Sequence, residues 1–300
     1  MECIAMFSDK AVAFEFFKEL RWPNGPVCPD CGCSEYSFLS TRLMFKCKAC
    51  KKQYSVKKGT IFEDSPLGLD KWLPAIWLIA NTKNGTSSHE LGRALGVTQR
   101  TAWFMLHRIR VAMKTGTFEK LQDVVEADET FVGGKSRNMH KHKREEKIQG
   151  RGAVGKAIVF GMIERGGEVR AYVISDRSRP TIEREIAKNV DKGAKLYTDS
   201  FTSYNTLRTR YRHEVVDHTA IEFVRGEVHT NGIENFWALF KRCIKGTYIS
   251  VLPCHLDSYL DEEVFRFNER KLKDADRFKT VVSQVSGKRI QYRELIARGR

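Results

Sequence analysis

Three acidic residues stand at positions where a carboxylate needs a specific reason to be present. Asp128 lies in the middle of Val124–Val132, a run of β-branched and apolar residues that predicts a strand ended by two glycines. Asp199 ends a second short apolar strand, and Glu234 lies in a strongly patterned helix that begins near Asn231. A carboxylate is costly to bury without a counter-charge or a metal. We therefore interpret the three carboxylates as one ligand set.

A shared site for these carboxylates predicts divalent cations. Three acidic side chains at one point repel one another strongly unless cations lie between them. Mg²⁺ suits such oxygen ligands better than zinc does, and Mn²⁺ is the alternative ion. Two ions about 3.5–4 Å apart would activate the attacking oxygen and stabilise the leaving oxygen of a phosphodiester displacement. The site is therefore expected to be catalytic and to act on nucleic acid.

The helix that carries Glu234 also offers basic groups. Lys241 and Lys245 follow Glu234 on one face, beside an apolar stripe that would pack on a sheet. A metal ligand and two phosphate-binding ammonium groups would then lie on one line; the alternative is a solvated face of an ordinary helix. Four other acidic residues are rivals for the third place, with Glu262 ranked first: Asp217, Asp261, Glu262 and Glu263.

The cysteines predict a second metal site. Five of the eight lie between residues 28 and 50, and in a cytosolic protein such clustering suggests a metal before disulfides. Two Cys-x-x-Cys pairs with fifteen residues between them match a structural zinc ribbon, whose metal supplies the folding energy. Cys33 could pair with Cys31 instead, but the two-residue gap fits a zinc knuckle better. The predicted zinc ligands are Cys28, Cys31, Cys47 and Cys50.

Residues 68–116 predict a helix-turn-helix. Ser87 and Glu90 have the spacing of a capping box that opens a short helix, Gly96 marks a turn, and Thr98 caps a longer basic helix. A recognition helix in the major groove and plain helix packing are the two interpretations. The residues expected to meet DNA are Gln99, Arg100, Thr101 and Arg108, with Lys245 as a further phosphate contact.

Composition restricts the partner and the location. The net charge of +15 and a pI near 9.5 favour a polyanionic partner, and nucleic acid is the default. The sequence has no apolar run of about 18 residues and no cleavable signal pattern, so we expect a soluble, cytoplasmic, nucleoid-associated protein with no membrane partner.

The order of the predicted elements indicates a multidomain α+β and α/β fold. From Gln122 onward, three strands, a helix, a strand, a helix, a strand and a terminal helix follow one another, which is the order of a ribonuclease-H-like mixed sheet with flanking helices. Residues 135–156 predict a flexible basic loop, and residues 59–69 read as a linker. The expected regions are an N-terminal helix (1–23), the zinc ribbon (24–58), the helix-turn-helix (68–116), the catalytic domain (122–270) and a basic C-terminal tail (271–300).

Three motifs carry a resemblance to a known family. The segments EADETFVGGK from Glu126, YTDS from Tyr197, and HTNGIENFW from His229, which continues to KRCIKGTY, resemble the ISXO-like transposases of bacterial insertion sequences. These belong to the DDE polynucleotidyl transferases, and the 34 residues between Asp199 and Glu234 are close to the gap in that class. The resemblance covers nearly the whole chain.

The resemblance implies a function and roles for particular residues. Asp128, Asp199 and Glu234 would be the metal-binding triad, and Lys241 the basic residue that follows it. The protein would bind the terminal inverted repeats, hydrolyse a strand at the element end, and transfer the 3′-hydroxyl to target DNA. The partner would be double-stranded DNA, and synapsis of two ends implies a homodimer. A non-catalytic regulator and a ribonuclease-H-like nuclease that cuts without joining remain open.

Overall fold

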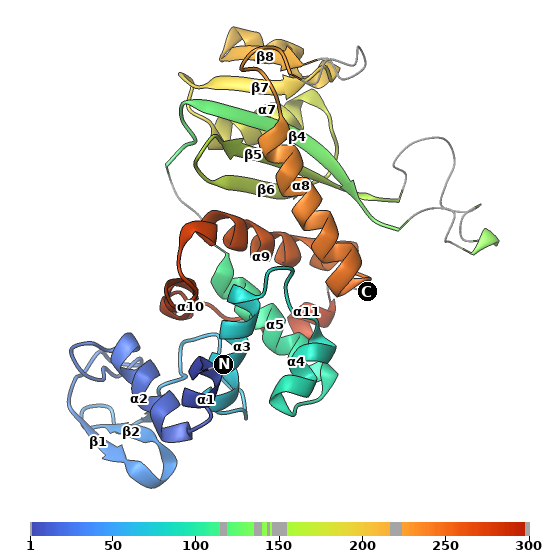
Figure 1. The fold of residues 1–300 in the computed structure, drawn as a ribbon. Coiled ribbons are helices and arrows are strands. Elements are labelled where there is room, and N and C mark those ends of the chain that lie inside the picture. The colour runs from blue at the N-terminus through green and yellow to red at the C-terminus, as the bar shows by residue number, and fades with distance from the viewer. Residues whose placement is uncertain are drawn as a thin grey trace. The chain divides into compact units, whose positions relative to one another are not determined.

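The chain folds into two compact units. The computed structural model describes residues 2–114, 119–134, 140–142, 145, 155–216 and 224–297. The first unit comprises Met1–Lys114 and Lys271–Arg300, and the second comprises Thr115–Arg270 (Figure 1). Most of the predicted basic loop, residues 135–156, and the rival carboxylate Asp217 lie outside the described residues. Among the described helices, none is long and apolar enough to cross a membrane.

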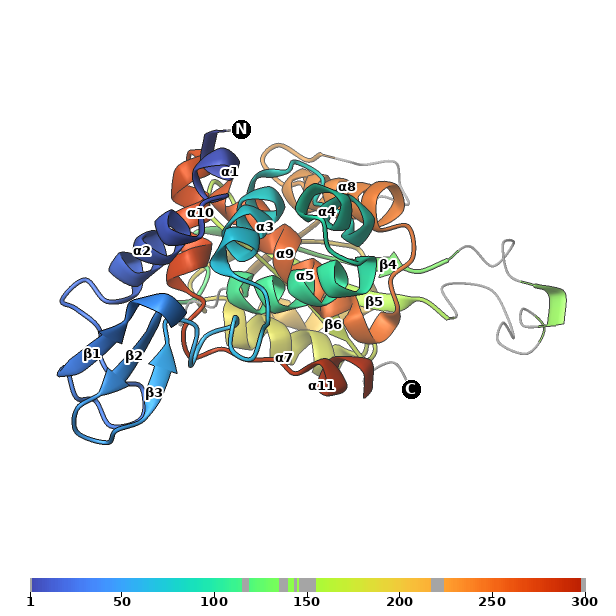
Figure 2. The same cartoon turned by 90° about the horizontal axis from the view of Figure 1, so that it is seen from below.

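A three-stranded antiparallel sheet forms the ribbon of the first unit, with its strands side by side (Figure 2). The strands are β1 (Tyr36–Leu39), β2 (Met44–Cys47) and β3 (Gln53–Ser55), in that order. Helix α2 (Lys10–Arg21), which follows the short α1 (Glu2–Met6), is capped by the Asp9 carboxylate. Phe14 of α2 stacks on Phe45 of β2, with ring centroids 6.1 Å apart, so aromatic packing joins this helix to the ribbon.

Three helices follow the ribbon. They are α3 (Leu69–Asn81), α4 (Ser88–Leu95) and α5 (Gln99–Met113). Ser87 and Glu90 form the predicted capping box, in which the Glu90 N–H donates to Ser87 Oγ at 3.2 Å and the Ser87 N–H donates to the Glu90 carboxylate at 2.9 Å. Gly96 then adopts a left-handed conformation, φ 64°, which ends α4 and turns the chain into α5.

The C-terminal residues pack within the first unit. Helix α10 (Asp274–Ser283) lies against α3, and Arg277 Nε donates to Asn81 Oδ1 at 3.0 Å. The segment predicted as a linker is also part of this core: Ile61 and Phe62 are buried, and the Ile61 N–H donates to the Val285 carbonyl at 3.0 Å. Helix α11 (Tyr292–Ala297) ends the described chain.

A five-stranded mixed sheet forms the second unit, in the order β6-β5-β4-β7-β8. Strands β4, β5 and β6 are antiparallel neighbours, whereas β7 runs parallel to both β4 and β8. The strands are β4 (Val124–Val132), β5 (Ala157–Glu164), β6 (Val169–Ile174), β7 (Lys195–Asp199) and β8 (Arg212–Val216). This is the mixed sheet predicted from the element order.

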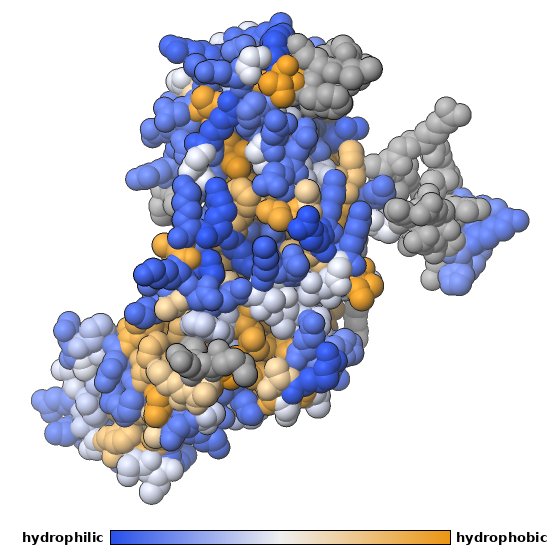
Figure 3. All heavy atoms as spheres, in the orientation of Figure 1, coloured by the Kyte–Doolittle hydropathy of each residue, from blue (hydrophilic) through white to orange (hydrophobic). Residues whose placement is uncertain are grey.

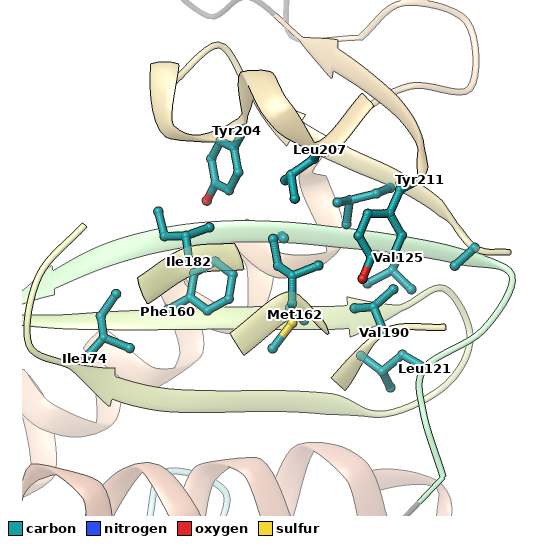
Figure 4. Close-up of a cluster of buried hydrophobic side chains, with 14 residues drawn as sticks. Leu121, Val125, Phe160, Met162, Ile174, Ile182, Val190, Tyr204, Leu207 and Tyr211 are labelled. Carbon is teal, nitrogen blue, oxygen red and sulfur yellow. The ribbon is translucent and has the colours of Figure 1, made fainter. Parts of the chain in front are cut away.

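Helices cover both faces of this sheet. They are α7 (Arg179–Asn189), the 3₁₀-helix η3 (Thr202–Thr209), α8 (Asn231–Cys243), the π-helical turn η5 (Ile244–Tyr248) and α9 (Leu256–Asn268). One buried cluster lies between the sheet and the segments α7 and η3, where Phe160, Ile182 and Leu207 meet (Figure 4). The other lies between the sheet and α8 with α9, and includes Val159, Phe236 and Leu260. Both flanks of the sheet are therefore buried.

Candidate active site

The alternation of side chains along β4 decides which residues face α8. Asp128 points toward α8, where the Trp237 indole N–H donates to its Oδ2 at 3.0 Å. Its neighbour Ala127 belongs to the opposite cluster. Asp128 pairs in register with Gly161 of β5, and the Trp237 ring covers this glycine. The central strand and the helix thus hold one carboxylate between them.

A second buried acid on the same face of β4 anchors the start of α8. Glu126 is 1% exposed, and its Oε2 accepts the backbone N–H groups of Gly232 at 2.7 Å and Ile233 at 3.1 Å. Arg165 Nε donates to Glu126 Oε1 at 2.8 Å, and His229 Nδ1 lies 3.3 Å from that oxygen. A carboxylate beside the first turn of a helix accepts hydrogen bonds from N–H groups that have no partner within the helix. Its negative charge also interacts favourably with the helix dipole. Glu126 therefore fixes the end of the helix that presents Glu234.

Glu126 is absent from the residues predicted for the site, although the sequence contains a signal for it. Residues two apart in a strand face the same side, so Glu126 and Asp128 had to lie on one face of β4. His229, the first residue of the HTNGIENFW motif, contacts both Glu126 and Arg165.

The other two predicted ligands lie within electrostatic reach of Asp128. Burial, followed by the charge of Asp199, raises the pKa of Asp128 to about 6, and the charge of Glu234 adds to the increase. Asp199 ends β7 next to β4, and one of its oxygens accepts the Phe201 N–H at 3.0 Å. Glu234 is exposed, and the Thr230 hydroxyl donates to it at 3.0 Å. The charges of Asp199 and Glu234 thus act on Asp128, which lies on the central strand beside α8.

The spacing of these carboxylates differs from that of a cage for one ion. In the part of the chain that the structure describes, only the four ribbon cysteines have ligand atoms that all lie within 4.8 Å of one another. The oxygens of Asp128, Asp199 and Glu234 are therefore farther apart. Burial and then the charges of Asp199 and Glu234 raise the pKa of Asp128, and a bound cation would offset both effects.

Basic residues follow Glu234 along α8. Lys241 is half-buried; burial lowers its pKa, while the charge of Asp128 raises it. Lys245 is exposed and lies in the π-helical turn after α8, and its charge adds to the effect of burial in lowering the pKa of Lys241. Hydrophilic side chains dominate the face of this unit that carries α8 (Figure 3).

The rival carboxylates of α9 are occupied by internal contacts. Glu262 is fully buried, forms an ion pair with Arg266 and accepts a hydrogen bond from Tyr248. Glu263 pairs with the same guanidinium and accepts from the Cys243 thiol at 3.2 Å. Asp261 lies on this helix too, and its charge adds to the effect of burial in raising the pKa of Tyr172. These contacts favour Glu234 over the α9 acids as the third carboxylate.

An additional, half-buried acid, Glu129, follows Asp128 on the other face of β4. The Tyr204 hydroxyl, which points toward β4 in Figure 4, donates to Glu129 Oε2. Burial raises the pKa of Glu129 to about 7, and the hydrogen bond from Tyr204 opposes this increase. The pattern of the strand alone could not show this pair, because Tyr204 belongs to η3, far away in the sequence.

The ribbon cysteines have the geometry of a tetrahedral metal site. Cys28 Sγ lies 3.7 Å from Cys50 Sγ, and Cys31 Sγ lies 3.5 Å from Cys47 Sγ. Four sulfur atoms at the usual zinc–sulfur distance would be about 3.8 Å apart. Cys33 is outside the group, and its sulfur accepts the Glu35 N–H at 3.4 Å. The site therefore fits structural zinc held by the four predicted residues.

Two of the residues predicted to contact DNA lie at the surface in the first turn of α5. Gln99 and Arg100 are exposed, and Thr101 is half-buried with its hydroxyl 2.8 Å from that of Thr98. Arg100 Nε donates to the Tyr292 hydroxyl at 2.6 Å.

Arg108 requires a correction, because the structure buries it. It is 4% exposed and donates to the Glu63 backbone carbonyl. Its guanidinium also packs over the rings of Phe104 and Trp72, at 5.1 and 5.8 Å from their centroids. The expectation that Arg108 is free to enter a groove of DNA is therefore wrong for this conformation. Helical spacing placed it on an outer face, but the segment before α3 covers that face.

Gly161 gives a test of the contact between β5 and α8. A Cβ at this position would lie 2.5 Å from Cη2 of Trp237 and 3.0 Å from Cδ1 of Ile233. Gly161→Ala should therefore lower the free energy of unfolding by about 1–3 kcal/mol, because the buried indole cannot move aside freely. Gly134→Ala is the matched control, since nothing lies within 4 Å of its Cβ. Equal stability of the two variants in urea titrations would contradict this packing.

Comparison with known proteins identifies the family. Residues 120–268 match the ISXO2-like transposase domain, and residues 8–53 match the transposase zinc-ribbon domain. These two domains place the chain among the transposases of insertion sequences. Within that class, the chain belongs to the ISXO2-like family.

Two relatives extend the match. An uncharacterized protein in transposable element ISH50 of Halobacterium salinarum is 28% identical over 279 residues, which cover 88% of this chain and 94% of the relative. An uncharacterized transposase-like protein of Haemophilus influenzae is 29% identical over 107 residues, 35% of this chain and 85% of the relative.

Two solved structures show weak similarity. One is a simian T-cell lymphotropic virus intasome in complex with the PP2A regulatory subunit B56 gamma (11% identity, TM-score 0.28, 63% of this chain and 66% of that chain). The other is a pre-cleavage Mos1 transpososome (12% identity, TM-score 0.26, 72% of this chain and 79% of that chain). Both scores are too low to establish a shared fold.

Proposed function

We propose that this protein is an active transposase that binds the terminal inverted repeats of its insertion sequence and joins the element ends to target DNA. The observation that carries the proposal is the electrostatic grouping of Asp128, Asp199 and Glu234, with Lys241 beside them, inside a domain of the ISXO2-like transposase family. In the first step, water attacks the phosphodiester at the element end and releases a 3′-hydroxyl. In the second, that hydroxyl attacks a target phosphodiester and displaces the target's own 3′-oxygen.

The residues of the proposed site have three roles: metal binding, phosphate binding and positioning. Asp128, Asp199 and Glu234 would hold Mg²⁺ or Mn²⁺, and the pKa of Asp128, raised by burial and then by the charges of Asp199 and Glu234, fits that role. Such ions, when bound, activate the attacking oxygen and stabilise the leaving one. Lys241 and Lys245 would bind phosphates of the strand being cut. Trp237 orients Asp128 and Glu126 fixes the first turn of α8, so both act by positioning.

DNA recognition would come from the first unit. Helix α5 follows a short capped helix and a glycine turn, and its first turn carries the exposed Gln99 and Arg100. The net charge of +15 supports contact with the phosphate backbone. Because two element ends must meet, we propose a homodimer in the DNA complex.

The deciding experiment is cleavage and joining of a labelled element-end duplex by the full chain, with Mg²⁺ or with EDTA, beside Glu234→Gln. We expect a joined product that requires Mg²⁺ and falls by at least about a hundredfold in the variant, since a metal ligand should matter more than its outer-shell partners. Nicking without joining would identify a nuclease, and tight binding without chemistry a regulator. Full activity of Glu234→Gln would remove Glu234 from the ligand set.

A further inference from the structure

A cavity of about 480 Å³ lies beside the first turn of α5, within the first unit. Three aromatic side chains line it, together with two arginines: Trp72, Phe104 and Tyr292 with Arg100 and Arg108. Its volume is in the range of small-molecule sites, and its lining is mainly apolar with a few polar groups. The residues that line the cavity belong to the first unit, whereas the three carboxylates belong to the second.

The buried arginine in this cavity has an unused donor. Arg108 is 4% exposed, and its Nε has no hydrogen-bond partner among the described residues. The nearby carboxylates of Glu63 and Asp64 form ion pairs with Arg289 instead. A buried donor without an acceptor is unfavourable, and more so on a charged group. Arg108 is therefore suited to a ligand that brings a hydrogen-bond acceptor.

The walls of the cavity are suited to a flat ring. The Phe104 and Tyr292 rings meet edge to face, with centroids 5.3 Å apart. The Arg100 guanidinium lies over Tyr292 at 4.8 Å, and that of Arg108 over Phe104 at 5.1 Å. Aromatic rings and guanidinium planes are the surfaces on which unstacked bases pack in nucleic-acid-binding proteins. Purines and pyrimidines also present oxygen or nitrogen acceptors at their edges.

The position of the cavity selects DNA as the source of that ring. Arg100 and Thr101 line the cavity and also belong to the first turn of α5, where the proposed function places the duplex. We propose that this cavity receives one base of the terminal repeat, rotated out of the duplex, with its ring against Phe104 and Tyr292 and its acceptor facing the Arg108 guanidinium. The proposal rests on the proposed function, in which α5 binds DNA. It adds recognition of a base outside the duplex to the recognition of base edges in the major groove.

A mismatch scan tests this proposal. Rotating a base out of the helix is easier when its partner does not pair with it. The full chain would be titrated with labelled terminal-repeat duplexes, each carrying one changed base in the opposite strand. We expect one position at which the mismatch tightens binding several-fold. Removing the base itself at that position should weaken binding about tenfold, the loss expected when one stacked base is lost.

Variants assign the effect to the cavity. Tyr292→Ala and Phe104→Ala should bind the intact duplex more weakly and lose both the mismatch gain and the abasic penalty. Ile296→Ala is the control, because this exposed residue lies on the same helix as Tyr292 but does not line the cavity. Thermal unfolding of each variant shows whether it is folded, and Tyr292→Ala is the decisive one because its side chain is only half-buried on a short terminal helix.

The outcomes separate this inference from the proposed function. Tight binding of the intact duplex with no mismatch-sensitive position would overturn the cavity proposal and leave the transposase proposal standing. A mismatch gain that persists in Tyr292→Ala would also overturn it, because the base would then be held elsewhere. Failure of the wild-type chain to bind the terminal repeat would overturn both.

Discussion

Asp128→Asn should abolish strand joining while leaving DNA binding unchanged. Loss of one carboxylate weakens the expected metal site, and joining should fall by at least about a hundredfold, more than the loss of an outer-shell partner causes. Asparagine keeps an oxygen that can accept the Trp237 indole N–H, so the fold around the site should persist. Labelled-end joining and Kd for the same duplex are the two measurements.

The same substitution should stabilise the protein when metal is absent. The pKa of Asp128 is raised to about 6 by burial and by Asp199, so the ionised form is unfavourable in the folded state at pH 7. Removing that charge should increase the free energy of unfolding in EDTA by about 1–2 kcal/mol. Added Mg²⁺ should then stabilise the wild type but not the variant, because a ligand that binds the folded state stabilises it.

A matched loss of charge controls for these effects. Glu214→Gln removes an exposed carboxylate from β8 and should change neither joining nor the response to Mg²⁺. If Asp128→Asn and Glu214→Gln joined DNA equally well, Asp128 would not be a ligand. Equal loss of binding and joining in Asp128→Asn would instead point to a general structural defect.

Removal of zinc should unfold the ribbon. Three short strands bury little apolar surface, and structural zinc in such small modules contributes about 10–16 kcal/mol to folding. Cys47→Ser removes a fully buried ligand and should lower the bound zinc from one ion per chain toward none. Protease should then cut within residues 24–58 first, while the helices from α3 onward resist it.

Cys33→Ser is the control for Cys47→Ser, because it removes a thiol from the ribbon without removing a predicted zinc ligand. Cys33 lies in the same ribbon but outside the four-sulfur group, so its variant should retain one zinc per chain. Zinc measured by mass spectrometry of the purified protein gives the comparison. Full zinc in Cys47→Ser, or equal loss in Cys33→Ser, would mean that the ligand set is assigned wrongly.

Local sequence patterns were sufficient for the parts of this protein that neighbours in the chain determine. The capping box of Ser87 and Glu90, the strand from Val124 to Val132 and the spacing of the cysteines all depend on residues a few positions apart. Element order then predicted the mixed sheet, because few topologies connect such strands and helices. The prediction of Asp128, Asp199 and Glu234 as ligands depends on the same kind of pattern, acids in strands and in a patterned helix.

Only the tertiary structure decided what depends on residues far apart. Helical spacing could not show that Arg108 is covered by Glu63 and Trp72, or that the tail packs on α3. The sequence leaves Glu262 as a rival ligand, whereas in the fold this carboxylate pairs with Arg266 and accepts a hydrogen bond from Tyr248. A charged residue in a sequence has no fixed role, because the free energy of burying it depends on the partner that the fold brings to it.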